Sequence, residues 1–277
     1  MSRYILHVLL LFGLCLSSMV SLLAEERLEI DFTLVEGRIL INGHLGGHDG
    51  VFIFDTGTPE IIINDSEIST NGAGYLSSVQ GDHPVAIKPV DIVRVADYTL
   101  PRGSLLMHMD LSELLGDLEQ KVLGIIGWSA FDADQPIFIN YRDSKIIVGK
   151  PEFTPEMVED NHVISLNLTE VGDELPTVEI EINQEILTFA FDTGAPLHAI
   201  GPQKPNQSRG DILQESIKLE GLITIAENQF RVEDMQDFDE FDGILSVNAL
   251  NTNYVVCLLY TSPSPRDRTR SRMPSSA

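Results

Sequence analysis

Two short segments of the chain each close an apolar stretch with the same three residues, Asp-Thr-Gly. They are residues 55–57, after the stretch 51–54, and residues 192–194, after the stretch 187–191. A continuous apolar run bounded by turn residues predicts a strand that is buried on both faces. A carboxylate is costly there unless it is paired, hydrogen-bonded or held for acid–base chemistry. One such turn is an ordinary feature, but two in the same context indicate a functional pair.

The segments around the two turns follow one plan, which predicts an internal duplication. A glycine motif follows each turn, Gly124–Phe131 in the first half and Gly243–Leu250 in the second. The segments are short and rich in Ile, Val and Phe, with turns between them, so we predict an all-β fold. The predicted strands that lead to the two turns are Leu28–Leu34, Arg38–Ile41 and Val51–Phe54, then Val163–Leu168, Thr177–Ile182 and Leu187–Phe191.

The first half is longer than the second between its two landmarks. Asp55 precedes Asp192 by 137 residues, whereas Gly124 precedes Gly243 by 119, a difference of 18. The extra residues lie within Gly72–Leu105. A long hairpin over a cleft and an ordinary surface excursion both fit this segment.

Both ends of the chain differ from its body. Residues 1–24 carry a basic Arg3, an apolar stretch and a small residue before two glutamates, which predicts a signal peptide and a secreted, periplasmic or otherwise extracytoplasmic protein. An uncleaved membrane anchor is the alternative. Residues 257–277 are basic and rich in Ser and Pro. They resemble the translation of an adapter sequence, so we expect an artefactual tail, with a natural disordered tail as the alternative.

The body between these ends is strongly acidic. The whole chain has a net charge of −24, which becomes −28 when Arg3 and, in the tail, four Arg and one Asp are removed. Nucleic acids and anionic membranes bind through clusters of Lys and Arg, so we expect neither as a partner. Cys15 and Cys257 both lie in the ends. The body therefore has no disulfide and depends on a packed core.

Two Asp-Thr-Gly turns, each after an apolar strand and each followed by an apolar-apolar-glycine-like motif, resemble the aspartic peptidases. The resemblance covers nearly all of residues 25–256 and is most specific at the turns. It implies a bilobal, pepsin-like pseudo-dimer of two β-barrel-like lobes, each similar to a retropepsin-like unit, with an active-site cleft between them. The lobes would be residues 25–150 and 161–256, with a linker at residues 151–160 that contains two prolines. The second lobe would be truncated, without its last strand.

The resemblance implies that Asp55 and Asp192 are the catalytic residues. Two carboxyls in contact cannot both ionise easily, so the pair holds one proton. The charged member would act as general base on a water, and the protonated member would polarise the peptide carbonyl. Because titration belongs to the pair, neither aspartate receives a fixed role.

The other residues of the two turns would support this pair. Gly57 and Gly194 would let the backbone approach closely, because they have no Cβ. The resemblance implies that Thr56 and Thr193 hydrogen-bond across the pseudo-dyad. One departure is Ser246, which stands where the first half has a glycine and could crowd the loop that supports Asp192.

The expected function is that of an aspartic endopeptidase, a monomeric hydrolase that cleaves an extended peptide or protein and needs no metal or other cofactor. The alternative is a catalytically impaired, peptidase-like binding or inhibitory protein, which Ser246 and the truncation favour. A purely structural exported β-protein would make the duplicated acids a coincidence.

Three weaker signals have simpler interpretations. The segment Gly127–Phe131 resembles a nucleophile elbow, but Phe131 stands where that turn needs its second glycine. His44 and His48 could bind a metal, yet a solvated hairpin turn explains them equally well. The acidic segment Glu233–Asp242 lacks the regular spacing of a calcium loop and is expected to be a charged rim.

Overall fold

The structure is a computed structural model in which nearly all regular elements are strands. The exceptions among the described residues are the one-turn helix α2 (Ser112–Leu115) and the 3-10 turn η2 (Trp128–Ala130), so the all-β prediction is confirmed. The expected signal peptide, the linker 151–160 and the tail beyond Leu259 lie outside the described residues. The structure describes residues 28–68, 74–78, 81–96, 98–100, 102–116, 118–131, 136–149, 163–168, 175–202, 207–219, 223–233, 235, 241–247 and 255–259.

Tight turns set the pairing of the first strands. Glu36-Gly37 and Gly46-Gly47 both have positive φ at two successive residues, as a type I′ hairpin turn requires. They join three successive antiparallel strands. The strands of the first half are β1 (Leu28–Val35), β2 (Arg38–Leu45), β3 (His48–Asp55), β4 (Ile61–Asn64), β5 (Gly74–Ser78), β6 (Gly81–Pro89), β7 (Val93–Val95), β8 (Tyr98–Thr99), β9 (Leu105–Met109), β10 (Val122–Gly127), β11 (Ile137–Asn140) and β12 (Lys145–Val148).

The strand that carries the first Asp-Thr-Gly turn lies inside the sheet. β3 pairs antiparallel with β2 on one side and parallel with β10 on the other, and Asp55 stands opposite Gly127. Phe52, Ile53 and Phe54 are buried, as the continuous apolar run predicts. β10 also pairs with β4, the strand that follows the turn.

The second half repeats this arrangement. β15 lies between β14, joined by the positive-φ turn Asn183-Gln184, and β19, with which it runs parallel. Asp192 stands opposite Ser246, and β16 after the turn pairs with β19. The strands are β13 (Val163–Leu168), β14 (Pro176–Ile182), β15 (Glu185–Asp192), β16 (His198–Ile200), β17 (Ile212–Leu219), β18 (Ile223–Val232), β19 (Gly243–Ser246) and β20 (Val255–Leu259).

The extra length of the first half forms hairpins. β6 and β9 pair as β17 and β18 do, but the small hairpin of β7 and β8 is inserted between β6 and β9. A second hairpin, of β5 and β6, precedes it. Where the structure describes Gly72–Leu105, the strands of this segment are thus arranged in hairpins.

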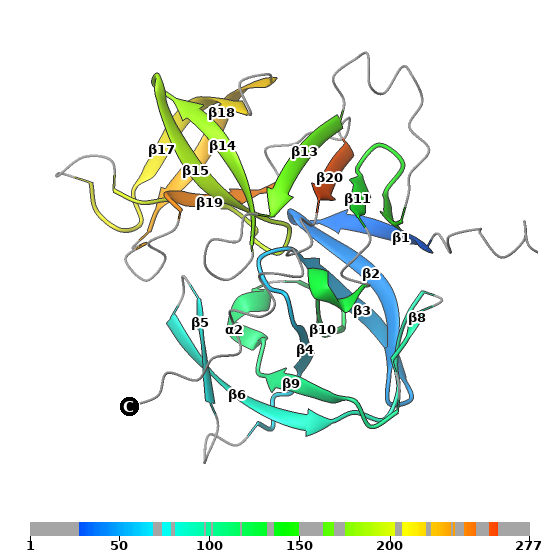
Figure 1. The fold of residues 1–277 in the computed structure, drawn as a ribbon. Coiled ribbons are helices and arrows are strands. Elements are labelled where there is room, and N and C mark those ends of the chain that lie inside the picture. Colours follow the sequence, from blue (N-terminus) through cyan, green and yellow to red (C-terminus); the bar gives the residue numbers. More distant parts are fainter. Residues whose placement is uncertain are drawn as a thin grey trace, which may run out of the picture.

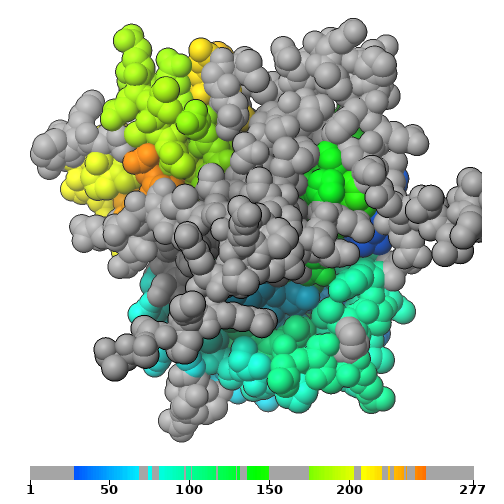
Figure 2. Space-filling view, in the orientation of Figure 1, coloured from blue at the N-terminus to red at the C-terminus, as the bar shows by residue number. Residues whose placement is uncertain are grey.

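A row of strands joins the two halves. β1, β12, β11, β20, β13 and β14 pair in that order, and Figure 1 shows β1, β11, β13 and β20 where the two groups of strands meet. β20 continues through Leu259, three residues beyond the expected boundary at Val256. In Figure 2 the cyan and blue-green residues of the first half occupy the lower part of the face in view, and the yellow-green to orange residues of the second half lie at the upper left.

One hydrophobic cluster contains residues of both halves. Its largest fully buried side chains are phenylalanines, and burial of each contributes about 1.5–3 kcal/mol to stability. Phe54 and Phe191 belong to this cluster and directly precede the two aspartates. The two Asp-Thr-Gly turns are therefore anchored in one shared core. The five phenylalanines are Phe52, Phe54, Phe189, Phe191 and Phe230.

Candidate active site

The two Asp-Thr-Gly turns meet. The side chains of Asp55 and Asp192 share a hydrogen bond. A Cβ atom added to Gly57 would lie 2.6 Å from the carboxyl carbon of Asp192, and one added to Gly194 would overlap the carboxyl of Asp55. Each glycine therefore makes room for the aspartate of the other half, so no side chain fits at either position without displacing a carboxyl.

Two buried threonines link the turns reciprocally. The Thr56 backbone N–H donates to Thr193 Oγ1 at 3.0 Å, and the Thr193 N–H donates to Thr56 Oγ1 at 3.1 Å. Each hydroxyl then donates across to the strand of the other half, Thr56 to the Phe191 carbonyl at 2.5 Å and Thr193 to the Phe54 carbonyl at 2.7 Å. Both threonine side chains are fully buried, so these four bonds hold the two turns at a fixed separation.

The environment raises the pKa of both carboxyls. Burial is the largest cause for Asp55 and for Asp192, and the negative charge of Asp192 raises the pKa of Asp55 further. The N–H of Gly57 donates to Asp55 at 2.7 Å, and the N–H groups of Gly194 and Ala195 donate to Asp192 at 2.8 Å. These bonds favour the charged form, so the arrangement suits a pair that keeps one proton and one charge.

The two turns differ in what supports them. In the first half, the Gly127 N–H donates to the Glu60 carbonyl at 2.9 Å. In the second half, Ser246 is buried, and its hydroxyl donates to the Ala195 carbonyl at 2.7 Å. Its backbone N–H donates to His198 Nδ1 at 3.1 Å. The serine is thus hydrogen-bonded within the loop rather than crowding it.

Sequence reasoning missed Arg38, which lies at the start of β2. Its side chain is buried and donates to the Leu114 carbonyl at 2.9 Å. Its positive charge lowers the pKa of Asp192, which places a cation close to the carboxyl pair. A single arginine that begins an apolar strand was the available signal, because burial of an arginine requires compensation. His198 was also missed, since a lone histidine in an apolar segment carries no pattern.

The weaker sequence signals have structural explanations. His44 Nδ1 bonds Asp49 at 2.9 Å, and its Nε2 accepts from the Gly47 N–H at 3.2 Å, so this histidine belongs to a hairpin turn. Within the part of the chain that is described, no group of three His, Cys, Asp or Glu side chains could hold a metal ion. No helix among those residues is long and apolar enough to cross a membrane.

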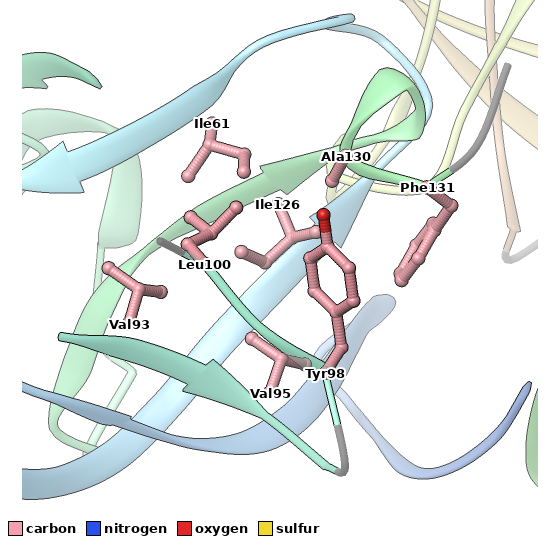
Figure 3. A pocket seen from close by; sticks show the side chains of 8 residues that line it. All are labelled: Ile61, Val93, Val95, Tyr98, Leu100, Ile126, Ala130 and Phe131. Carbon is pink, nitrogen blue, oxygen red and sulfur yellow. The ribbon is translucent and has the colours of Figure 1, made fainter. Parts of the chain in front are cut away.

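A small apolar cavity lies within the first half, away from the carboxyl pair. Figure 3 shows the Tyr98 ring reaching across it, among aliphatic side chains from β4, β7 and β10. Neither aspartate lines this cavity, so it is not the candidate site. Its lining residues are Ile61, Val93, Val95, Tyr98, Leu100, Ile126, Ala130 and Phe131.

Comparison with known proteins gives little. No protein-family model matches the sequence, and no curated protein matches it. Among solved structures, the chain is similar to basic 7S globulin from soybean, with 12% sequence identity and a TM-score of 0.43 over 80% of this chain and 89% of that one. A likeness this weak carries no inference about function.

Proposed function

We propose that the protein is an aspartic endopeptidase, built as a bilobal, pepsin-like pseudo-dimer with its active site between the lobes. One observation carries the proposal: each glycine of the two turns lies against the aspartate of the other half, and this brings the two carboxyls together. The reciprocal threonine bonds also support it, because each of them connects one turn to the other and neither lies within a single turn. Two halves that repeat one strand arrangement and meet at identical turns fit a duplicated acid–base site.

The chemistry follows from the shared proton. The charged carboxyl of the pair removes a proton from a water as that water attacks the peptide carbonyl. The protonated carboxyl donates a hydrogen bond to the carbonyl oxygen and stabilises the charge that develops there. Proton transfer to the leaving nitrogen completes the cleavage and returns the pair to one proton. The buried surroundings keep that proton on the pair above the ordinary pKa of a carboxyl.

The substrate that fits this chemistry is a peptide or an unfolded protein in extended conformation. The carboxyl pair supplies both acid and base, so the reaction needs no metal and no other cofactor. We further propose that the protein acts as a monomer, because the two halves of one chain supply both acids. We place its action outside the cytoplasm, because residues 1–24 have the features of a signal peptide. Its acidic surface suits neither nucleic acid nor anionic membrane as a partner.

Substitution of each aspartate tests the proposal. Asp55→Asn and Asp192→Asn should each abolish hydrolysis of an unfolded protein substrate, and the double variant should be scarcely worse, because the pair acts as one unit. Wild-type activity should be bell-shaped in pH and highest on the acidic side. Asp49→Asn is the matched control, since it makes the same change at an exposed hairpin aspartate.

Both single variants should fold, which makes loss of activity interpretable. An amide fills nearly the same volume and can donate to the remaining carboxylate. The raised pKa of Asp55 means that stabilisation from its proton is greatest below pH 3.8 and is lost as the pH rises through the folded pKa. Asp55→Asn should therefore be at least as stable as the wild type at pH 7. A folded single variant that keeps substantial activity would refute the proposal. A folded wild type that binds peptides without cleaving them would instead favour the binding or inhibitory alternative.

A further inference from the structure

His198 occupies an unusual place near the carboxyl pair. It lies six residues after Asp192, and Ile61 lies six residues after Asp55, so the duplication puts an apolar side chain at the matching position of the first half. The His198 side chain is buried, and its ring centroid lies 5.2 Å from that of Phe230. A buried imidazole is costly unless its polar atoms bond. The hydrogen bond that this ring makes at Nδ1 therefore matters for the second half.

A continuous series of hydrogen bonds connects this ring to the site. The Ser246 N–H donates to His198 Nδ1 at 3.1 Å, and the Ser246 hydroxyl donates to the Ala195 carbonyl at 2.7 Å. The Ala195 N–H then donates to the Asp192 carboxyl at 2.8 Å. Two side chains, His198 and Ser246, thus hold residue Ala195, whose carbonyl accepts from Ser246 and whose N–H donates to the aspartate.

In the first half, backbone hydrogen bonds connect the aspartate turn to the glycine motif. The Gly127 N–H donates to the Glu60 carbonyl at 2.9 Å, and the Trp128 N–H donates to the Thr58 carbonyl at 3.2 Å. A Cβ at Gly127 would overlap the backbone of residues 59 and 60. A side chain therefore does not fit at Gly127, whereas the matching position of the second half holds Ser246, whose N–H donates to His198.

We propose that His198 is a positioning residue for Asp192, acting through Ser246 and the backbone of Ala195. This inference rests on the proposed peptidase function. The neutral imidazole accepts at Nδ1, so it carries its hydrogen on Nε2. Protonation would turn Nδ1 into a donor that faces the Ser246 N–H and would break the series of bonds.

The series of hydrogen bonds from His198 to Asp192 should therefore break in acid. Burial lowers the pKa of His198 to about 4. Among the side chains that the structure describes, the charged groups on the neighbouring elements are Asp192 in the turn, Arg231 on β18, Glu233 just after β18, and Asp242 before β19. Arg231 pairs with Glu233 at 2.8 Å, and the Asp242 carboxylate accepts from the Thr188 N–H at 2.8 Å. Below about pH 4 the protonated His198 releases Ser246, which sets an acid limit on activity separate from that of the carboxyl pair.

Two substitutions at His198 distinguish the effect of the hydrogen-bond acceptor from the effect of protonating the ring. His198→Asn places an Oδ1 acceptor near the position of Nδ1 and does not titrate, so it should keep kcat at pH 6 and extend activity to lower pH. His198→Leu removes the acceptor and should lower kcat by about tenfold to 100-fold with little change in KM. Ser246→Ala should act in the same direction, because the Ala195 carbonyl loses its donor. Rescue by Asn but not by Leu is a result that a merely structural role would not give.

A readout without turnover keeps this inference distinct from the proposed function. In the folded wild type, the NMR signals of the His198 ring and of the Ser246 amide should titrate together with a midpoint of about 4, and the Asp192 carboxyl carbon should respond at the same pH. In His198→Asn that response should vanish. If the chain cleaves no peptide, the proposed function is wrong, but these titrations still show whether His198 is coupled to Asp192. The inference is overturned if His198→Leu keeps the wild-type kcat and acid limit, or if the Asp192 signal does not follow His198.

Discussion

The Asp55 turn and the Asp192 turn are alike where they touch and different where they are supported. Each turn has a carboxyl, a threonine that hydrogen-bonds to the other half, and a glycine that leaves room for the opposite carboxyl. Behind the turns, the first half uses backbone bonds around a glycine, whereas the second half uses a serine and a buried histidine. Contact between halves constrains both turns equally, but support comes from within each half and is free to diverge. The second turn should therefore be the pH-sensitive one.

The largest effect should come from the glycines between the halves. Gly57→Ala and Gly194→Ala each push a methyl group against the opposite carboxyl, and a displacement near 1 Å lowers kcat by about 100-fold. Both variants should lose activity to a similar extent. Gly201→Ala is the control, since a Cβ there meets only ordinary contacts of 3.5 Å or more. If either variant keeps full activity, the opposed geometry of the turns is wrong.

Exchanging Gly127 and Ser246, which stand opposite the two aspartates, should destabilise the two halves unequally. Gly127→Ser forces a side chain into the backbone of residues 59 and 60 and should cost about 3 kcal/mol of unfolding free energy. Ser246→Gly only removes one hydroxyl bond, to the Ala195 carbonyl, and should cost about 1 kcal/mol. Urea denaturation of both variants measures the difference. Equal costs would show that the two halves are supported in the same way.

The pH dependence of the unfolding free energy should reveal the contribution of His198. Its folded pKa, about 4, is below the ordinary value of 6.5, so its contribution is complete above pH 6.5 and is lost as the pH falls toward 4. The loss should approach about 3 kcal/mol. The carboxyl pair changes the unfolding free energy with the opposite sign. It is present in the wild type and in His198→Asn, so its contribution cancels when the two proteins are compared. Unfolding free energies at pH 7 and pH 4 should therefore differ more in the wild type than in His198→Asn. An identical difference would contradict the neutral buried imidazole.

The threonines should give the most symmetrical result. Thr56→Val and Thr193→Val each leave a buried N–H and a buried carbonyl without a partner, which should cost roughly 2 kcal/mol in either half. The double variant should cost less than the sum, because either substitution alone already loosens the contact between the two turns that both hydroxyls maintain. Thr58→Val, whose hydroxyl bonds only the nearby Glu60, is the control. Additive losses would mean that the two hydroxyls act independently.

Much of the fold could be predicted because its signals are local. Apolar runs bounded by turn residues gave the strands that carry both aspartates, and the expected Val163–Leu168 agrees with β13. Type I′ turns at Gly46-Gly47 follow from residues that tolerate positive φ. The pairing of β20 with β11 and β13 could not be predicted, because it joins segments far apart in the sequence.

The site shows the same division. The acids, threonines and glycines were predictable because they occur twice in one pattern. Arg38 was not, since its place beside the carboxyls depends on how β2 packs and not on its neighbours in sequence. The partnership of His198 with Ser246 spans 48 residues and appears in only one half, so no repetition marks it.

The most direct test of the account is whether Asp55 and Asp192 titrate as one pair. Carbon-13 NMR of labelled aspartate carboxyls, assigned with the two Asn variants, follows each group in the folded protein. We predict two coupled steps, with one proton kept well above pH 3.8, and a changed pKa of either carboxyl when the other is replaced by Asn. If each carboxyl titrates near 3.8 and is unaffected by substitution of the other, the two turns do not form a proton-sharing pair, and the central claim is contradicted.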